Sequence, residues 1–229
     1  MSKYTKFWEK EYKTGQHLKL STSPSEDLQK FIHWLERETG KKYLKSVASV
    51  LDLGCGNGRN LNYLSLTYGM HGTGYDISSE AISQAKKLGA GLPLTYEVGS
   101  LDKPIPLPDA SQTIVLDMMA SHVLNSEQRK FLLSEIVRVL RPDGWLFFKT
   151  FLLDEDRHAK HLLEEHPAEE AGTYIHPKIG VAEHVFTEDE ITELLSPYFH
   201  IHKMSPSHGH LRGGKAHKRR SISVWAQRN

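Results

Sequence analysis

Three glycines alternate with other residues where an apolar stretch gives way to a polar one. Residues 52–60 read DLGCGNGRN, and they follow the apolar run 47–51. Glycine is required where a chain turns tightly and where a ligand lies directly against the backbone. A strand that feeds such a turn into a helix presents backbone N–H groups at the start of that helix. The stretch therefore predicts a ligand-binding turn, and a turn with a purely structural role is the alternative.

The spacing of these glycines disfavours a dinucleotide as the ligand. A dinucleotide turn has the pattern G-x-G-x-x-G, and Arg59 stands where that pattern needs its third glycine. Asp52 lies just before the turn, where a carboxylate would repel a pyrophosphate and attract an ammonium group or a hydroxyl donor. A second carboxylate, Asp76, ends the run 71–76 and can accept hydrogen bonds from both hydroxyls of a ribose. Together these residues favour a cationic nucleoside without phosphate.

Apolar runs and amphipathic segments alternate along most of the chain. Runs typical of buried strands lie at 47–53, 71–75, 94–98, 113–118, 145–151, 198–204 and 221–226. Helices are predicted at 4–12, 24–39, 60–68, 79–88, 125–140, 154–165 and from 186 onward, and residues 167–185 are predicted to be irregular. In the second helix, Ser23 is the predicted N-cap and Pro24 the first helical residue. The alternation predicts a doubly wound α/β fold, with a mostly parallel sheet between two helical layers.

Four stretches resemble the motifs of class I S-adenosylmethionine-dependent methyltransferases. DLGCGNGRN resembles the family's first motif, and GYDIS at 74–78 resembles the acid motif after its second strand. The stretches 98–119 and 132–150 resemble the third, fourth and fifth strands with their connections. The resemblance covers residues 45–152 closely and the remainder loosely. It implies a seven-stranded sheet whose last strand is antiparallel, with S-adenosylmethionine as cofactor and S-adenosylhomocysteine as product.

The resemblance also implies roles for individual residues in cofactor binding. Asp52 would lie near the amino group, Asp76 would bind the ribose, and Ile77 would pack on the adenine. Asp102 is the expected partner of the adenine amine. The full set of expected cofactor contacts is Asp52, Gly54, Cys55, Gly56, Gly58, Asn60, Asp76, Ile77, Leu101, Asp102, Asp117 and Met118. Cys55 is interpreted as a small residue beneath the cofactor rather than as a nucleophile.

Methyl transfer is an in-line displacement at carbon, so the protein mainly has to align the acceptor with the methyl group. A catalytic base is needed only for some acceptors. His122 is the candidate base, because it follows the fourth strand at the edge where α/β sheets hold ligands and because imidazole titrates near neutral pH. A histidine that caps the next loop is the alternative, and Lys149 in the fifth strand is the second candidate.

The loop 207–220 between the last two strands is the strongest candidate for binding an acceptor. It carries five lysine and arginine residues and three histidines but no acid, so it predicts a rim for a carboxylate, a phosphate or a nucleic-acid backbone. A solvated basic loop is the alternative, and no metal site is expected because no cysteine or carboxylate completes the histidines. The segment 171–180 and the aromatic N-terminus would form a lid or simply cover the sheet. The candidate substrate contacts are Trp8, Tyr12, Tyr174, His176, Arg212, Lys215 and Lys218.

The composition excludes several classes of protein. Of 229 residues, 38% are hydrophobic and 25% charged, unlike a disordered, collagen-like or coiled-coil chain. The one cysteine cannot form an intramolecular disulfide. The charged start, MSKYTKFWEKEYK, does not resemble a signal peptide, and no apolar run is long enough for a bilayer. We therefore expect a cytoplasmic protein without membrane contacts.

The sequence thus predicts an enzyme that transfers a methyl group from S-adenosylmethionine to an anionic small molecule. Residues 1–44 would form a helical N-terminal cap, and 45–229 the methyltransferase domain, with 151–186 as a lid-like insertion. One alternative is an RNA methyltransferase that uses the basic loop 208–220, although a net charge of +1 does not favour it. The other is a non-catalytic subunit that binds the cofactor for a partner.

Overall fold

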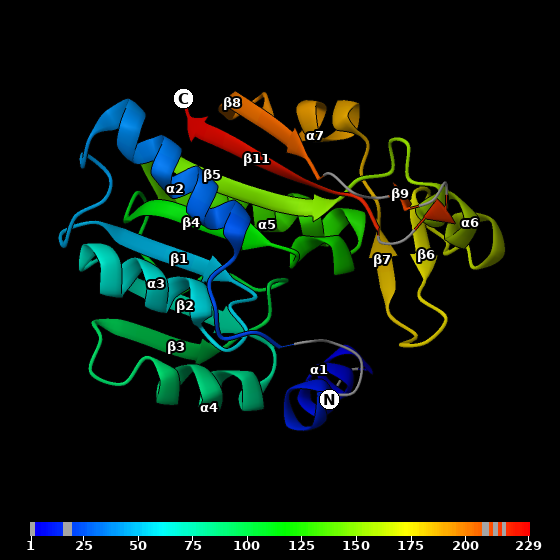
Figure 1. Ribbon diagram of the computed structural model, residues 1–229, viewed down its shortest axis with the longest axis horizontal. Helices are drawn as coiled ribbons and strands as arrows, with labels where there is room; N and C mark the ends of the chain where they lie inside the picture. The colour runs from blue at the N-terminus through cyan, green and yellow to red at the C-terminus, as the bar shows by residue number, and fades with distance from the viewer. Residues whose placement is uncertain (1–2, 16–19, 208–210, 213–214, 217–218) are drawn as a thin grey trace.

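The computed structural model describes residues 3–15, 20–207, 211–212, 215–216 and 219–229. A seven-stranded sheet runs through the molecule in the order β3-β2-β1-β4-β5-β11-β8 (Figure 1). The strands are β1 (Ser49–Leu53), β2 (His71–Asp76), β3 (Leu94–Val98), β4 (Gln112–Met118), β5 (Leu140–Phe151), β8 (Phe199–Pro206) and β11 (Ser221–Arg228). The pairs among β1 to β5 are parallel, and β11 is antiparallel to both β5 and β8. The predicted doubly wound sheet with an antiparallel last strand is confirmed.

Helices cover both faces of the sheet because its central strands are apolar on both sides. One core packs against α2 (Glu26–Thr39), α3 (Arg59–Tyr68) and α4 (Ser79–Leu88), and it includes Val50 and Phe147. The other packs against α5 (Ser126–Val139) and α7 (Glu188–Leu195), and it includes Leu51 and Phe148. Consecutive strand residues thus face opposite cores, as the period of a strand requires. The result is the predicted three-layer arrangement. Among the described residues, no helix is long and apolar enough to cross a membrane.

Side-chain caps begin three of these helices. The hydroxyl of Ser78 accepts from the N–H of Ala81, and that of Thr187 accepts from Glu190. Asn125 forms a full capping box with Gln128 at the start of α5. The caps at Ser78 and Asn125 fix where α4 and α5 begin after β2 and β4.

The predicted start of α2 is wrong. The helix begins at Glu26 with Ser25 as its N-cap, two residues later than Ser23 would place it, and Ser25 makes no side-chain cap bond. Instead, its backbone N–H donates to Asn60 Oδ1 at 3.0 Å. The segment 20–25 lies extended along the glycine turn, where Asn57 and Arg59 donate to carbonyl groups of this segment. These tertiary hydrogen bonds outweigh the local capping preference.

The connection between β5 and α7 contains more regular structure than predicted. Besides α6 (Arg157–Glu165), it forms an antiparallel hairpin of β6 (Thr173–Ile175) and β7 (Ala182–His184) within the stretch predicted to be irregular. Three-residue strands are too short to leave a periodic signal in the sequence. A second small hairpin, β9 (Leu211–Arg212) with β10 (Lys215–Ala216), lies in the basic loop.

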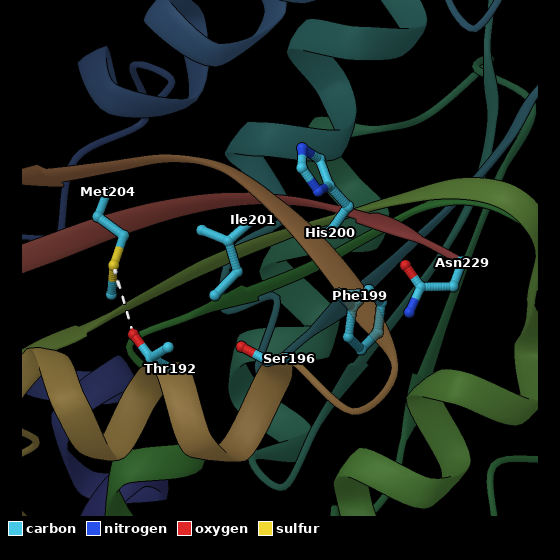
Figure 2. Close-up of a pocket in the computed structure, with 7 residues that line it drawn as sticks. All are labelled: Thr192, Ser196, Phe199, His200, Ile201, Met204 and Asn229. Atoms are coloured by element: carbon cyan, nitrogen blue, oxygen red, sulfur yellow. Dashed lines mark hydrogen bonds between the residues drawn. The ribbon is translucent and has the colours of Figure 1, made fainter.

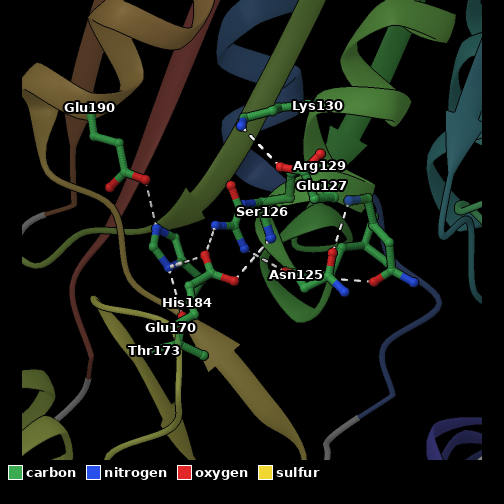
Figure 3. A network of polar contacts seen from close by, with 11 residues as sticks. Asn125, Ser126, Glu127, Arg129, Lys130, Glu170, Thr173, His184 and Glu190 are labelled. Carbon is green, nitrogen blue, oxygen red and sulfur yellow. Dashed lines mark hydrogen bonds and ion pairs between the residues drawn. The ribbon is translucent and has the colours of Figure 1, made fainter.

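A buried polar network anchors the β6–β7 hairpin to the start of α5 (Figure 3). Glu170 accepts from the backbone N–H of Ser126 at 2.9 Å and pairs with the guanidinium of Arg129. His184 in β7 contacts Thr173 at 2.9 Å and Glu190 at 2.7 Å through its two ring nitrogens. The network holds β7 against the 3₁₀ turn η1 (Ser121–Val123), which follows β4.

The first helix, α1 (Lys3–Thr14), lies beyond the carboxyl ends of the parallel strands (Figure 1). Glu9 accepts from both the backbone and the hydroxyl of Ser79, at 2.6 and 2.7 Å, and so caps the N-terminus of α4. Near the N-terminus of α1, the hydroxyl of Tyr4 bonds to both the N–H and the carbonyl of Ala182 in β7. α1 therefore bridges α4 and the hairpin. The predicted domain boundary at residue 44 stays a prediction, while α2 packs in the same core as the sheet.

Candidate cofactor and acceptor site

A cavity of about 1120 Å³ lies at the carboxyl ends of the parallel strands, beneath α1. Most of the predicted cofactor residues line it, namely Asp52, Gly54, Cys55, Gly56, Asn60, Asp76, Ile77, Leu101, Asp102 and Met118. Trp8 and Tyr12, predicted as substrate contacts, line it as well. Gly58 and Asp117 do not. The structure therefore brings together in one space the acids and glycines that the sequence predicted separately.

Two of the glycines are required for different reasons. Gly56 has φ of +55°, and a Cβ added there would stand 2.3 Å from the hydroxyl of Tyr12, inside the cavity. Gly58 has φ of +77°, and its added Cβ would stand 2.5 Å from the hydroxyl of Tyr96, which is buried in the core. Gly56 thus keeps the floor of the cavity open, whereas Gly58 makes room for packing behind it.

Asp76 is joined to the glycine turn. Its Oδ2 accepts from the N–H of Gly56 and its Oδ1 from that of Ser78, both at 2.9 Å. Burial raises the pKa of Asp76, and the two backbone N–H groups work in the opposite direction. The carboxylate is thereby fixed at the end of β2, facing the cavity.

One carboxyl oxygen of Asp52 lacks a hydrogen-bond partner in the part of the molecule that the structure describes. The residue is 1% exposed, and its Oδ2 is buried without a hydrogen-bond partner among the described residues. Burial, together with the nearby charge of Asp76, raises the pKa of Asp52 to about 8. A buried carboxyl of this kind is stabilised by a cationic donor placed against it. The α-ammonium group of S-adenosylmethionine is such a donor, so Asp52 fits the role that the resemblance implies.

Cys55 and Tyr12 close the cavity around the turn. The Cys55 thiol is buried under the turn, and burial raises its pKa, which keeps it protonated and poorly nucleophilic. Burial likewise raises the pKa of the Tyr12 hydroxyl, which lies against Gly56. The buried, protonated thiol agrees with a packing role for Cys55.

At the end of the cavity near Asp102, both carboxylate oxygens of that residue already accept hydrogen bonds from the protein. Asp102 Oδ1 accepts from the hydroxyl of Ser100 at 2.6 Å, and its Oδ2 accepts from the Gln128 amide at 3.2 Å. Ile77 and Leu101 supply the apolar surface beside it. This end suits a flat heterocycle with a polar edge.

Asp117 turns away from the cavity. Its Oδ1 accepts from the backbone N–H of Ser121 at 3.1 Å, and the residue is 2% exposed. Successive side chains of a strand point to opposite sides, so the neighbouring Met118 faces the cavity and Asp117 does not. Asp117 instead fixes the turn η1.

The ring of His122 lies behind the cavity wall. Its Nε2 is 3.8 Å from Oε1 of Glu183, and its ring meets Phe151 edge-on at 5.0 Å. Its Nδ1 has no hydrogen-bond partner within the described part of the chain. Ala120 and Val123 line the cavity on either side of it, whereas His122 does not. Its role as a base therefore stays a prediction.

The other predicted acceptor residues are partly described. Tyr174 is fully buried and donates to Glu183 at 2.6 Å, and neither Tyr174 nor His176 lines the cavity. Arg212 and Lys215 lie in β9 and β10, but their side chains, like the whole of Lys218, are outside the described part of the chain.

Several lining residues were not predicted. Tyr4 and Thr5 line the cavity from α1, and only the aromatic content of the segment 4–12 gave a signal for them. Lys149, predicted only as the second candidate base, also lines it, and its ammonium lies 2.6 Å from Asp27 Oδ2 in the first turn of α2. That pairing joins residues 122 positions apart, so no local pattern could reveal it.

A smaller hollow of about 560 Å³ lies between α7 and β8 (Figure 2). Thr192 bonds to the sulfur of Met204 across it, at 3.9 Å. None of the predicted site residues lines this hollow. The chemistry-bearing side chains therefore gather at the larger cavity.

Comparison with known proteins finds methyltransferases among the proteins that this chain resembles. Residues 51–148 match a family described as a methyltransferase domain. The chain is 27% identical over 138 residues to a fatty-acid O-methyltransferase of Mycolicibacterium smegmatis, a match that covers 60% of this chain and 49% of that protein. A solved S-adenosylmethionine-dependent methyltransferase of Methanosarcina mazei is 25% identical, with a TM-score of 0.68 over 81% of this chain and 94% of that one.

A second solved structure is the 1,6-didemethyltoxoflavin-N1-methyltransferase of Burkholderia thailandensis with S-adenosylhomocysteine bound. It is 18% identical, with a TM-score of 0.69 over 99% of this chain and 87% of that one, and shows likeness of fold. The chain spans about half the length, or less, of the curated relatives it matches. Residues 51–148 match the methyltransferase-domain family, and the resemblance of this stretch to class I methyltransferases is confirmed.

Substitution of Asp76 tests the ribose contact. We expect Asp76→Ala to weaken binding of S-adenosylhomocysteine by about tenfold or more, because two hydroxyl partners and the anchor of Gly56 are lost together. Calorimetric titration of both proteins measures this. Unchanged affinity would contradict the role of the acid.

Proposed function

We propose that this protein is an S-adenosylmethionine-dependent methyltransferase that methylates an anionic small molecule and releases S-adenosylhomocysteine. The observation that carries the proposal is the continuity of the cavity. The cavity extends from the acids Asp52 and Asp76 past Met118 to a part that is lined by residues of α1. One continuous volume can therefore hold the methyl donor and an acceptor side by side.

The donor end follows from the residues described above. When bound, S-adenosylmethionine supplies a methyl group on a positively charged sulfur. Asp52 would hold its ammonium group, Asp76 its ribose, and Ile77 and Leu101 its adenine. Because Gly56 has no side chain, the backbone of the turn leaves room for the cofactor at this point. Met118, at the end of β4, then marks the boundary between donor and acceptor.

The acceptor end is apolar, aromatic and covered. Tyr4, Trp8, Met119, Val123 and Leu124 line it. Pockets for small ligands occupy roughly 300–1,000 Å³, so a cavity of about 1120 Å³ has room for the cofactor and a small acceptor together. The cover by α1 would exclude water from the transfer. The limited volume and the apolar lining support a small molecule rather than an RNA strand as acceptor.

Two observations support an anionic acceptor. Lys149 places an ammonium group in the cavity wall, although Asp27 already balances its charge. The fatty-acid O-methyltransferase relative is named for an acceptor with a carboxyl group. His122 as a base remains part of this proposal, and His122→Asn would slow transfer only if the acceptor must lose a proton.

A transfer assay tests the proposal. The full chain is incubated with S-adenosylmethionine labelled in the methyl group, first with a panel of aromatic and aliphatic carboxylic acids and then with total cellular RNA. We expect labelled small molecules and release of S-adenosylhomocysteine. Label in RNA alone would contradict the small-molecule acceptor. Cofactor binding without transfer to any member of either set would favour the non-catalytic subunit.

A further inference from the structure

The guanidinium of Arg219 is enclosed by aromatic rings and one carboxylate. Arg219 lies two residues before β11, and its side chain is 12% exposed. Its Nη1 donates to Glu183 Oε2 at 2.6 Å. Its central carbon lies 3.3 Å from the ring centroid of Phe151 and 5.0 Å from that of Tyr174. The faces of the guanidinium are thus occupied by rings, which leaves its edges for hydrogen bonds.

One edge of this guanidinium has no acceptor. Nε and Nη2 are both buried, and neither has a hydrogen-bond partner among the described residues. The N–H groups on these two atoms are parallel and form the fork that binds a carboxylate through both oxygens. Buried donors on a cation are nearly always paired, so this open fork requires a partner.

Glu183 cannot serve the open edge as well. Its Oε2 already accepts from Tyr174 and Arg219, and its Oε1 faces His122. Burial would raise the pKa of Glu183, but the contacts with His122, Arg219 and Tyr174 lower it to about 2. The carboxylate therefore stays charged and engaged, and it holds the guanidinium with its fork directed elsewhere.

The Arg219–Glu183 pair lies behind the acceptor end of the cavity. Tyr4 lines the cavity, and its hydroxyl bonds to Ala182, the residue before Glu183. On the other side, Val123 lines the cavity directly after His122, which faces Glu183. Arg59, Lys103 and Lys149 line the cavity itself, and Arg219 lies behind this end as a buried cation with one open edge.

We propose that the open edge of Arg219 binds a carboxylate group of the methyl acceptor and anchors it, while another atom of the acceptor receives the methyl group near Met118. Nε and Nη2 are closed to solvent, so binding requires a local rearrangement of the residues around them. The inference rests on the proposed function for the identity of the ligand, but the site itself is testable by binding alone.

Calorimetry on the full chain saturated with S-adenosylhomocysteine provides the test. The probes are benzoate, phenylacetate and hexanoate, each compared with its primary amide, and inorganic phosphate as a tetrahedral anion. We expect at least one acid to bind, with its amide and phosphate weaker by about tenfold. An amide that binds as well as its acid, or binding of phosphate alone, would overturn the proposal, as would no binding of any acid at 20 mM (about 2.3 kcal/mol).

Arg219→Lys removes the fork and keeps the charge beside Glu183. We expect it to weaken the acid by about tenfold and to leave the affinity for S-adenosylhomocysteine unchanged. Arg220→Lys is the matched control, since Arg220 is similarly buried but donates to the backbone carbonyl of Asp154 and pairs with the carboxylate of Glu155. Equal binding of the acid to both variants would overturn the site.

A spectroscopic measurement covers the case in which Arg219→Lys does not fold. In the unaltered protein, the Nε–H resonance of Arg219 should shift on addition of the acid but not of the amide. No shift at saturating acid would contradict the proposal. If acids bind at Arg219 but none is methylated, the site stands and the proposed function fails, so the two outcomes are distinguishable.

Discussion

Gly56→Ala is expected to weaken binding of S-adenosylhomocysteine by about 100-fold, equivalent to about 2.7 kcal/mol. The added Cβ would stand 2.3 Å from the Tyr12 hydroxyl, on the floor of the cavity where the cofactor must lie. Because Tyr12 can swing away, the fold should survive while the floor stays raised. Calorimetric titration with S-adenosylhomocysteine measures the effect.

Gly91→Ala is the control for backbone strain. Gly91 has φ of +83°, and an added Cβ would meet nothing within 4 Å. Both variants therefore force alanine into the left-handed region, at about 1–2 kcal/mol, but only the first fills the cavity. We expect Gly91→Ala to lose stability and to keep its affinity. Similar affinities for both variants would show that the floor of the turn does not contact the ligand.

The second large effect concerns Asp52 and pH. Burial raises its pKa to about 8 in the free protein, and a bound ammonium group would lower it. Below pH 8 the carboxyl is mostly protonated, so binding must release a proton. The affinity for S-adenosylhomocysteine should therefore rise with pH, approaching a tenfold change per unit between about pH 6 and pH 7 and levelling off above 8.

Asp52→Asn isolates this group from Asp76, whose pKa burial also raises. The variant should bind about 100-fold more weakly at pH 8 and lose most of the pH dependence. Its free form should be more stable than the unaltered protein at pH 8, because a carboxyl with a raised folded pKa loses stability as pH rises from its unfolded to its folded value. A variant that kept the pH dependence would assign the proton to another group.

The sheet could be predicted almost completely from the sequence, because its strands are apolar on both faces and its helices carry local caps. Ser78, Asn125 and Thr187 form such caps. The start of α2 could not be predicted, because Asn60, far away in the sequence, fixes Ser25. The hairpin of β6 and β7 is likewise held by tertiary contacts rather than by its own periodicity.

The donor end of the site was predictable because one continuous motif builds it. Asp52, at the end of β1, and Gly56, in the turn that follows it, belong to the same motif, and Asp76 follows at the end of the next strand. The acceptor end was not, since α1 and η1, which lie far apart in the sequence, both line it. His122 illustrates the difference: its position after β4 was clear, but the direction of its ring depends on Glu183.

The most direct test is a crystal structure of the protein with S-adenosylhomocysteine. The account predicts the nucleoside at the turn 52–60, with its amino group at Asp52, its ribose hydroxyls at Asp76 and its sulfur directed toward Met118. Density for the nucleoside in the hollow between α7 and β8, or elsewhere on the surface, would contradict the account.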